Sequence, residues 1–285
     1  MPVGVAFRPV RVMTMNVLAP EYADGVGRRA VLARELAGLA PDVLALQEVT
    51  RADVAALADD GWHVLPHPRY GSDGVGAVLA ARTPFAAVTA DPLAVSDRTA
   101  RTEWCGVVTA LLPLPEPFGP LLVGHHKPSW PYGWELEREQ QALVTARLVA
   151  EMADEYSARH TLLLGDFDAT PDAASIRFLR GFQSLDGTSA CYQDVWASAR
   201  PDGAPEPGPT FTPENPLVRR GDMPEAGERR LDYILVGCGP HGPTLHVSGC
   251  RRVMVEPVDG VQVSDHYGLV ADLVPPDHPP GAWAD

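Results

Sequence analysis

One short segment constrains this chain more than any other: the run LLLGDFD, from Leu162 to Asp168. Three consecutive leucines favour a buried strand, and Gly165 ends the apolar run. If the chain stays extended, Asp166 and Asp168 point to the same side and Phe167 points into the core. A buried strand that ends in two carboxylates is where α/β folds place chemistry. The alternative is a surface turn that uses aspartate for its turn-forming side chain.

The N-terminal part of the chain predicts a βαβ unit. Residues 10–16 alternate and predict a strand that ends at Asn16, and residues 42–46 predict a buried strand followed by Glu48. Apolar residues at helical spacing predict a helix over 28–39. Parallel neighbours bring their carboxyl ends to one edge, so Asn16 and Glu48 are expected to lie together. Alternatively, Asn16 is a turn residue and Glu48 a helix N-terminal charge.

The remaining elements follow from the same reading of periodicity and turn residues. Four closely spaced strands predict an antiparallel meander: 62–66, 75–81, 85–95 and 104–112. Further strands are predicted at 121–124, 161–165, 230–236 and 244–255, and a last strand ends at residue 270. Helices are predicted at 51–58, 135–156, 171–180 (with Thr170 as its cap) and near 193–199. Residues 201–230 predict a long surface loop that covers a site or moves. We expect a single domain over 1–275 and a proline-rich tail over 276–285.

Composition narrows the functional classes. The net charge is −14 and the pI is about 5.0, which disfavours nucleic acid as a partner because phosphate contacts need basic side chains. Lys127 is the only lysine. Four cysteines without a C-x-x-C spacing argue against a structural zinc site and give no disulfide framework. We expect free thiols, no signal peptide, no membrane anchor and a cytoplasmic location.

A second polar strand end precedes an aromatic loop. The strand predicted at 121–124 runs into two histidines and then Lys127. Trp130, Tyr132 and Trp134 follow in a loop with two prolines. Exposed aromatic side chains beside a reactive strand end suit stacking on a base, a ring or an apolar chain. We therefore expect Lys127 and these three aromatics to bind substrate. The alternative is that the loop folds its aromatics onto its own domain.

Polar residues at strand ends form a set with a common chemistry. Carboxylate oxygens without cysteine ligands suit a hard cation such as Mg²⁺ or Mn²⁺. Two histidines near carboxylates suit acid–base work near neutral pH. The set is Asn16, Glu48, His126, Asp166, Asp168, Asp232, Asp265 and His266.

These motifs, in this order, resemble the endonuclease/exonuclease/phosphatase superfamily, which has the deoxyribonuclease-I-like fold. The matching pieces are M-T-M-N at 13–16, L-Q-E-V at 46–49, G-H-H at 124–126, R-E-Q-Q at 138–141, L-G-D-F-D at 164–168, R-L-D-Y-I-L at 230–235 and S-D-H at 264–266. The resemblance implies a four-layer α/β sandwich of two mixed sheets with helices outside. It also implies divalent-metal-dependent hydrolysis of a phosphoester by an activated water.

The resemblance assigns a metal site and a base. Glu48 would be the principal metal ligand, with Asn16 and Asp265 close to the ion. His266 would activate the attacking water, and Asp232 would fix its tautomer and raise its basicity. A metal that neutralises charge and a base that activates water are what an anionic phosphodiester requires.

The remaining roles concern the phosphate. His126 would donate to the phosphate or to the leaving oxygen, and Glu103 would orient His126. Asp166 would hold or polarise the nucleophile. The family usually has Asn where this chain has Asp168. An ionised carboxylate cannot donate a hydrogen bond to phosphate, so Asp168 indicates an altered metal site or a substrate with a different charge.

Three functions remain open at the level of sequence. The leading interpretation is a Mg²⁺-dependent hydrolase of a phosphodiester or of a small phosphorylated metabolite. A DNA or RNA endonuclease or exonuclease is the second, against which the acidic charge argues. The third is a non-catalytic binding module on the same fold, with Asp168 as the first sign of lost catalysis.

Overall fold

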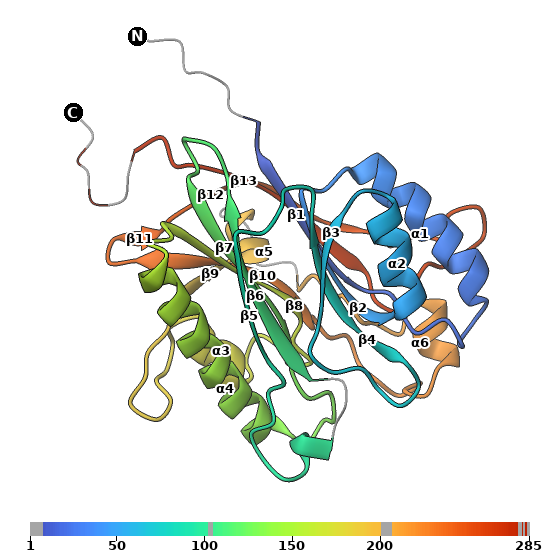
Figure 1. Ribbon diagram of the computed structural model, residues 1–285. Coiled ribbons are helices and arrows are strands. Elements are labelled where there is room, and N and C mark those ends of the chain that lie inside the picture. Colours follow the sequence, from blue (N-terminus) through green and yellow to red (C-terminus); the bar gives the residue numbers. More distant parts are fainter. Residues whose placement is uncertain (1–7, 102–104, 201–206, 279–280, 282, 284–285) are drawn as a thin grey trace.

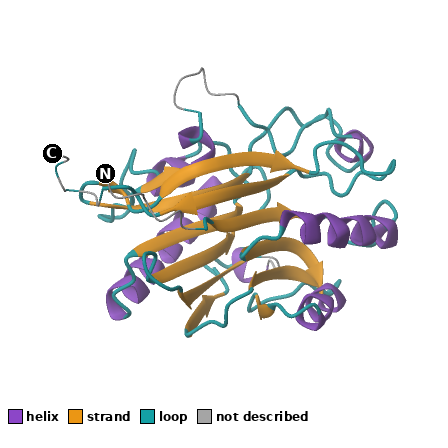
Figure 2. Cartoon of the chain, turned by 90° about the horizontal axis from the view of Figure 1, so that it is seen from above, coloured by secondary structure: helices purple, strands orange, loops and turns teal. Residues whose placement is uncertain are grey.

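Two β-sheets pack face to face, and helices cover the outer face of each (Figure 1). The computed structural model describes residues 8–101, 105–200, 207–278, 281 and 283. Seen from above, the layers run helix, sheet, sheet, helix (Figure 2). This arrangement confirms the predicted four-layer α/β sandwich.

The first sheet has the strand order β12-β13-β1-β2-β4-β3. Its strands are β1 (Val10–Asn16), β2 (Val43–Thr50), β3 (His63–Pro66), β4 (Val75–Ala81), β12 (His246–Val253) and β13 (Gly268–Val274). Helices α1 (Gly25–Leu39) and α2 (Arg51–Asp59) cover its outer face. The parallel pair β1–β2, joined by α1, confirms the predicted βαβ unit.

The second sheet has the order β11-β10-β8-β7-β6-β5, with β9 paired to β10. Its strands are β5 (Ala87–Asp91), β6 (Gly106–Pro113), β7 (Pro120–Lys127), β8 (His160–Asp166), β9 (Tyr192–Asp194), β10 (Asp232–Gly239) and β11 (Gly242–Pro243). The remaining helical elements are η1 (Thr99–Arg101), α3 (Glu135–Glu155), α4 (Ala174–Leu179), α5 (Val195–Ser198) and α6 (Pro216–Arg220). Strands β7 and β8 are its parallel pair.

Strand β8 shows why the leucine run suits this architecture. Leu162 and Leu164 point into the core between the sheets, whereas Leu163 points outward against α3. All three are fully buried. Both faces of the strand are covered, so an unbroken apolar run replaces the usual alternation. Burial of each such side chain is worth roughly 1.5–3 kcal/mol, which anchors the strand whose end carries Asp166.

Two local predictions are wrong. The four strands predicted as one meander divide between the sheets, with β3 and β4 in the first and β5 and β6 in the second. Thr170 does not cap a helix: α4 begins at Ala174 after Ala173, and the Thr170 hydroxyl donates to Asp172 instead. Within the described residues, no helix is long and apolar enough to cross a bilayer.

Candidate active site

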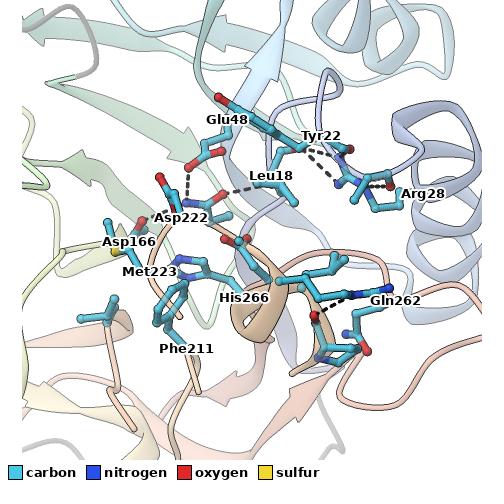
Figure 3. Close-up of a pocket in the computed structure, with 18 of the residues that line it drawn as sticks. Leu18, Tyr22, Arg28, Glu48, Asp166, Phe211, Asp222, Met223, Gln262 and His266 are labelled. Carbon is cyan, nitrogen blue, oxygen red and sulfur yellow. Dashed lines mark hydrogen bonds between the residues drawn. The ribbon is translucent and has the colours of Figure 1, made fainter. Parts of the chain in front are cut away.

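The strand ends of both sheets meet at a cavity of about 940 Å³ (Figure 3). The first sheet contributes the ends of β1 and β2 and the segment before β13. The second contributes the ends of β7 and β8 and the segment before β10. The predicted site residues that line the cavity are Asn16, Glu48, Lys127, Trp130, Asp166, Asp168, Asp265 and His266.

Asn16 joins the two sheets through its side-chain amide. Its Nδ2 donates to Glu48 Oε1 at 2.9 Å and to Asp166 Oδ2 at 3.1 Å. Its Oδ1 accepts the backbone N–H of Leu18 at 3.1 Å. The amide nitrogen, not the oxygen, therefore faces the carboxylates. In this arrangement Asn16 positions two acidic side chains, and it would have to rotate its amide to offer an oxygen to a cation.

Glu48 lies at a β-bulge, which turns its side chain into the cavity. The register of β2 against β4 shifts between Gln47 and Val49, and Glu48 has φ 61°. Its Oε2 accepts the backbone N–H of Ala19 at 3.0 Å. Burial, together with the negative charge of Asp265, raises the pKa of Glu48 to about 7. Two mutually repelling carboxylates on the wall of one cavity are a feature that suits a bound cation.

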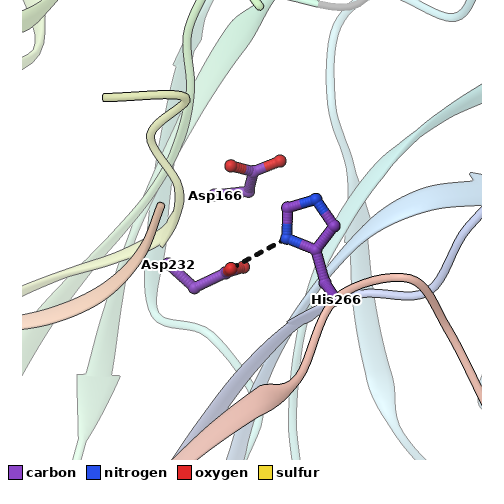
Figure 4. A group of neighbouring side chains, drawn as sticks. All are labelled: Asp166, Asp232 and His266. Carbon is purple, nitrogen blue, oxygen red and sulfur yellow. Dashed lines mark hydrogen bonds and ion pairs between the residues drawn. The ribbon is translucent and has the colours of Figure 1, made fainter. Parts of the chain in front are cut away.

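His266 and Asp232 form a buried pair across the two sheets (Figure 4). His266 Nδ1 lies 2.9 Å from Asp232 Oδ2. The Thr210 hydroxyl accepts the backbone N–H of Asp232 at 3.2 Å. Burial opposes the charged imidazole, but Asp232 and Asp166 outweigh it and raise the pKa of His266 to about 10. The pair holds a proton on Nδ1 and leaves Nε2 as the ring atom open to other partners.

This pair and Asp166 together form a cluster of groups that could hold a metal ion. Asp166, Asp232 and His266 each have a ligand atom, and these atoms lie within 4.8 Å of one another. Asp232 stands opposite Asp166 in the antiparallel pair of β10 and β8, which explains the proximity. Asp265 follows Ser264, whose hydroxyl donates to Asp265 Oδ1 at 3.1 Å. Carboxylate oxygens on three sides of the cavity fit a hard divalent cation.

Lys127 supplies positive charge at the floor of the cavity. Its Nζ lies 3.1 Å from Asp166 Oδ2 and forms a second ion pair with Asp168 Oδ2. Burial would raise the pKa of Asp166, but Lys127 outweighs it and lowers that pKa to about 2. Burial and the neighbouring Asp166 raise the pKa of Asp168 to about 6. The two carboxylates therefore share one ammonium.

His126 does not face the cavity, and its expected contact with the phosphate is not supported by this geometry. It lies on the outer face of the second sheet, where its Nδ1 lies 2.8 Å from the Thr145 hydroxyl and its ring packs on Phe167. Burial lowers its pKa to about 3. His125 points the other way, into the space between the sheets, where its Nε2 lies 2.7 Å from Gln47 Nε2. Glu103, expected to orient His126, lies outside the described residues.

The three aromatics of the loop after β7 separate. Trp130 lines the cavity and is 47 % exposed. The guanidinium of Arg229 lies over the ring of Tyr132, 4.2 Å from its centroid. The guanidinium of Arg98 lies over the ring of Trp134, 4.6 Å from its centroid. Neither Tyr132 nor Trp134 lines the cavity. Of the three, Trp130 alone stands where it can contact a ligand in the cavity.

Two further parts of the chain contribute to the site: Arg28, which the sequence did not predict, and the loop at 207–231. Arg28 is 1 % exposed and donates to backbone carbonyls around the cavity wall. Its position in a helical pattern gave no hint of that role. The loop at 207–231 contributes Phe211, Met223 and Arg229 to the lining. The prediction that this loop covers a site agrees with its position, although the short helix α6 within it was not predicted.

The comparisons with known proteins bear on this geometry. The sequence profile of the Endonuclease/Exonuclease/phosphatase family matches residues 13–266. The chain belongs to this family. Family members are metal-dependent phosphoesterases, and this chain is an enzyme of that class. No curated protein sequence matches it significantly.

Several solved structures share the fold. One is the D. rerio TDP2 complexed with single strand DNA product: 16% identity, TM-score 0.71, 93% of this chain and 98% of that chain covered. Another is the human Nocturnin catalytic domain with bound sulfate anion: 19% identity, TM-score 0.67, 95% and 97% covered. A third is an endonuclease/exonuclease/phosphatase from Bacteroides vulgatus: 17% identity, TM-score 0.69, 94% and 99% covered. At these identities the likeness establishes the fold.

Proposed function

We propose that this enzyme hydrolyses a phosphodiester or a small phosphorylated metabolite in the cavity, with Mg²⁺ or Mn²⁺ as its cation. The observation that carries the proposal is that His266, paired with Asp232 behind it, lines one cavity together with the carboxylates of Glu48, Asp166 and Asp265. Such a set provides a base, a cation site and a holder for water within one reaction volume.

Glu48 and Asp265 would hold the cation, with Asn16 orienting Glu48 through its amide. When bound, a divalent cation neutralises the phosphate and polarises its oxygen. The two acidic side chains that meet at Glu48 are the feature that fits such an ion. These assignments agree with the chemistry of the residues, since oxygen donors suit Mg²⁺ and Mn²⁺.

His266 would accept the proton of the attacking water. The water oxygen forms a bond to phosphorus while the bond to the leaving oxygen breaks, and the proton moves to Nε2 of His266. Asp232 keeps Nδ1 protonated and stabilises the imidazolium that results. The high pKa of His266 falls when positive charge is bound nearby, because like charges disfavour each other. Asp166, which stands opposite Asp232 on the neighbouring strand, would orient the attacking water.

A nuclease activity is the second candidate. Arg220, Arg229 and Trp130 line the cavity, and such side chains can contact a phosphate backbone or stack on a base. The net charge of −14 opposes binding of a long polyanion. We therefore favour a short substrate that places one phosphoester in the cavity.

Hydrolysis of bis-p-nitrophenyl phosphate and p-nitrophenyl phosphate, measured side by side with Mg²⁺, Mn²⁺ or EDTA, tests the proposal. Diesterase activity that EDTA abolishes supports it, and monoesterase activity alone selects a phosphorylated metabolite. Plasmid DNA and nucleotides then separate the nuclease from the small-substrate enzyme. If Asp232→Asn or Glu48→Gln retains full activity, the proposed mechanism is wrong.

A further inference from the structure

His126 was expected to contact the phosphate, but its side chain faces α3. A different residue on the same strand reaches the cavity. Strand β7 alternates: Leu121 and Val123 point into the core between the sheets. Lys127 continues that face and ends in the cavity. The strand therefore presents an ammonium, not an imidazole, to the site.

Lys127 is the only lysine in the chain, whose other strongly basic side chains are all arginines. The two residue types differ in shape. An ammonium is a compact charge with three donors in a tetrahedral arrangement, whereas a guanidinium is a planar fork. A compact charge can bridge two carboxylates that approach from different directions and still donate once more. The chain uses arginine at its other strongly basic positions, and the lysine here therefore indicates a need for the more compact ammonium.

The contacts of Lys127 match that requirement. The side chain is 5 % exposed, and its Nζ pairs with Asp166, which is 1 % exposed, and with Asp168, which is 12 % exposed. Two of its three donors are thus engaged within the described structure. Because Lys127 also lines the cavity, the third donor is available to an acceptor bound there.

Asp168 is held so that it can anchor this ammonium. Its backbone has φ 51°, a left-handed conformation that Asp and Asn tolerate better than most residues. Its N–H donates to Asp166 Oδ1 at 3.1 Å, and its carbonyl accepts from Arg229 Nη2 at 3.4 Å. A neutral Asn at this position would leave the ammonium with one carboxylate partner.

We propose that Lys127 is the positive contact for the substrate's phosphoryl group, and that Asp168 is the positioning residue that holds its ammonium in place. The inference rests on the proposed phosphoester hydrolysis. The Lys127–Asp168 pair thereby replaces the neutral amide of the family's usual Asn, and Asp168 is not a sign of lost catalysis. The third Nζ donor is directed to a phosphoryl oxygen, where it stabilises the charge that develops as the leaving bond breaks.

Because the chain has a single lysine, its ammonium group can be observed directly by NMR. Protein labelled with ¹⁵N-lysine gives one side-chain ammonium resonance, and burial in ion pairs slows its proton exchange enough for detection. The probe is inorganic phosphate, titrated in the presence of Mg²⁺ at constant ionic strength. We expect the resonance to shift saturably. An absent resonance overturns the buried ion pair, and a resonance that phosphate leaves unmoved, at concentrations that inhibit hydrolysis, overturns the phosphoryl contact.

Kinetics of variants give the second test. Lys127→Met should lower kcat/KM for bis-p-nitrophenyl phosphate by about 10²- to 10³-fold. Asp168→Asn, which restores the family's usual residue, should lower kcat/KM by about 10- to 100-fold and move the ammonium resonance. If Asp168→Asn raises activity or leaves the resonance in place, Asp168 is not the positioning residue.

Two comparisons keep the outcomes distinct. Lys127→Met removes the ammonium that pairs with two buried carboxylates, which destabilises the fold. The double variant Lys127→Met/Asp168→Asn removes one of those carboxylate charges as well, and it should show no greater loss of activity than Lys127→Met. Asp194→Asn breaks another buried ion pair, with Arg230, outside the cavity lining and should leave the lysine resonance in place. If no phosphoester is hydrolysed but phosphate shifts the resonance, the proposed function fails and the anion contact stands.

Discussion

His266 Nδ1, just before β13 of the first sheet, lies 2.9 Å from Asp232 Oδ2 at the start of β10 in the second sheet. The pair therefore forms only when both sheets are packed together. Asp232 is fully buried, so a lost partner cannot be replaced by water at low cost. If the proposed mechanism holds, catalysis depends on correct packing of the two sheets through this contact.

Asp232→Asn should lower kcat by about 10²- to 10⁴-fold, because the amide no longer holds His266 in the tautomer with Nδ1 protonated. The measurement is steady-state hydrolysis of bis-p-nitrophenyl phosphate with Mg²⁺. Asp194→Asn is the matched control, since it also changes a buried aspartate of the second sheet. Equal losses in the two variants would indicate a general packing defect rather than a role for the pair.

Mg²⁺ should stabilise the folded protein, because the cavity gathers carboxylates whose repulsion it relieves. At a free concentration 100-fold above Kd, the gain in unfolding free energy is about 2.7 kcal/mol. Thermal unfolding with and without Mg²⁺ measures it. Glu48→Gln should remove most of the Mg²⁺-dependent rise in Tm, whereas Asp59→Asn, at the exposed end of α2, should preserve it. An identical rise in both variants would place the cation elsewhere.

Arg28→Met should lower the free energy of unfolding by at least about 3 kcal/mol, since each buried carbonyl left unpaired costs roughly 1–3 kcal/mol. The acceptors are the backbone carbonyls of Val17, Leu18, Ala19, Tyr22, Ala23 and Val263. Urea unfolding measures the loss. Arg34→Met, on an exposed side chain of the same helix, should cost no more than about 0.5 kcal/mol.

The buried histidine His67 should make stability depend on pH. Burial, and then the charge of Lys127, lower the pKa of His67 to about 3 from 6.5. The folded state stays neutral while the unfolded state binds a proton, so stability is fully present above pH 6.5 and falls as the pH drops toward 3. One such group contributes about 1.4 kcal/mol per pH unit in that window.

Replacement of His67 isolates this contribution. His67 has no hydrogen-bond partner for either ring nitrogen within the described residues, so His67→Phe removes the titrating group without breaking a bond. Urea unfolding from pH 7 to pH 4 should show a shallower slope in this variant. His63→Phe, on the exposed face of β3, should keep the wild-type slope. A slope unchanged by His67→Phe would mean that His67 is protonated in the folded state or that its titration does not control stability.

The sequence predicted the elements that carry periodic apolar residues, and it predicted which strand ends meet. Strand β1 has the predicted limits, and Asn16 contacts Glu48 because parallel strands end at a common edge. The orientation of β7 was not predictable in this way. Leu121, Leu122 and Val123 are all apolar, since both faces of the strand are buried, and such a run carries no information about which residue faces the site.

The ion pair of Lys127 with Asp168 could not be derived from sequence for a related reason. Lys127 ends β7 and Asp168 follows the end of the neighbouring β8, 41 residues further along the chain, and their contact depends on the left-handed turn at Asp168. Arg28 likewise sits in an ordinary helical pattern, and its role depends on carbonyls that converge only after the loop at 17–23 has folded. Both are consequences of tertiary packing, which local periodicity does not encode.

The most direct test of the account is kcat/KM for bis-p-nitrophenyl phosphate at saturating Mg²⁺, in the wild-type enzyme, Glu48→Gln and Asp59→Asn. We expect Mg²⁺-dependent hydrolysis in the wild type and in Asp59→Asn, and a loss of at least about 10²-fold in Glu48→Gln. Equal hydrolysis in all three proteins would show that the cavity at Glu48 is not where the phosphoester is cleaved.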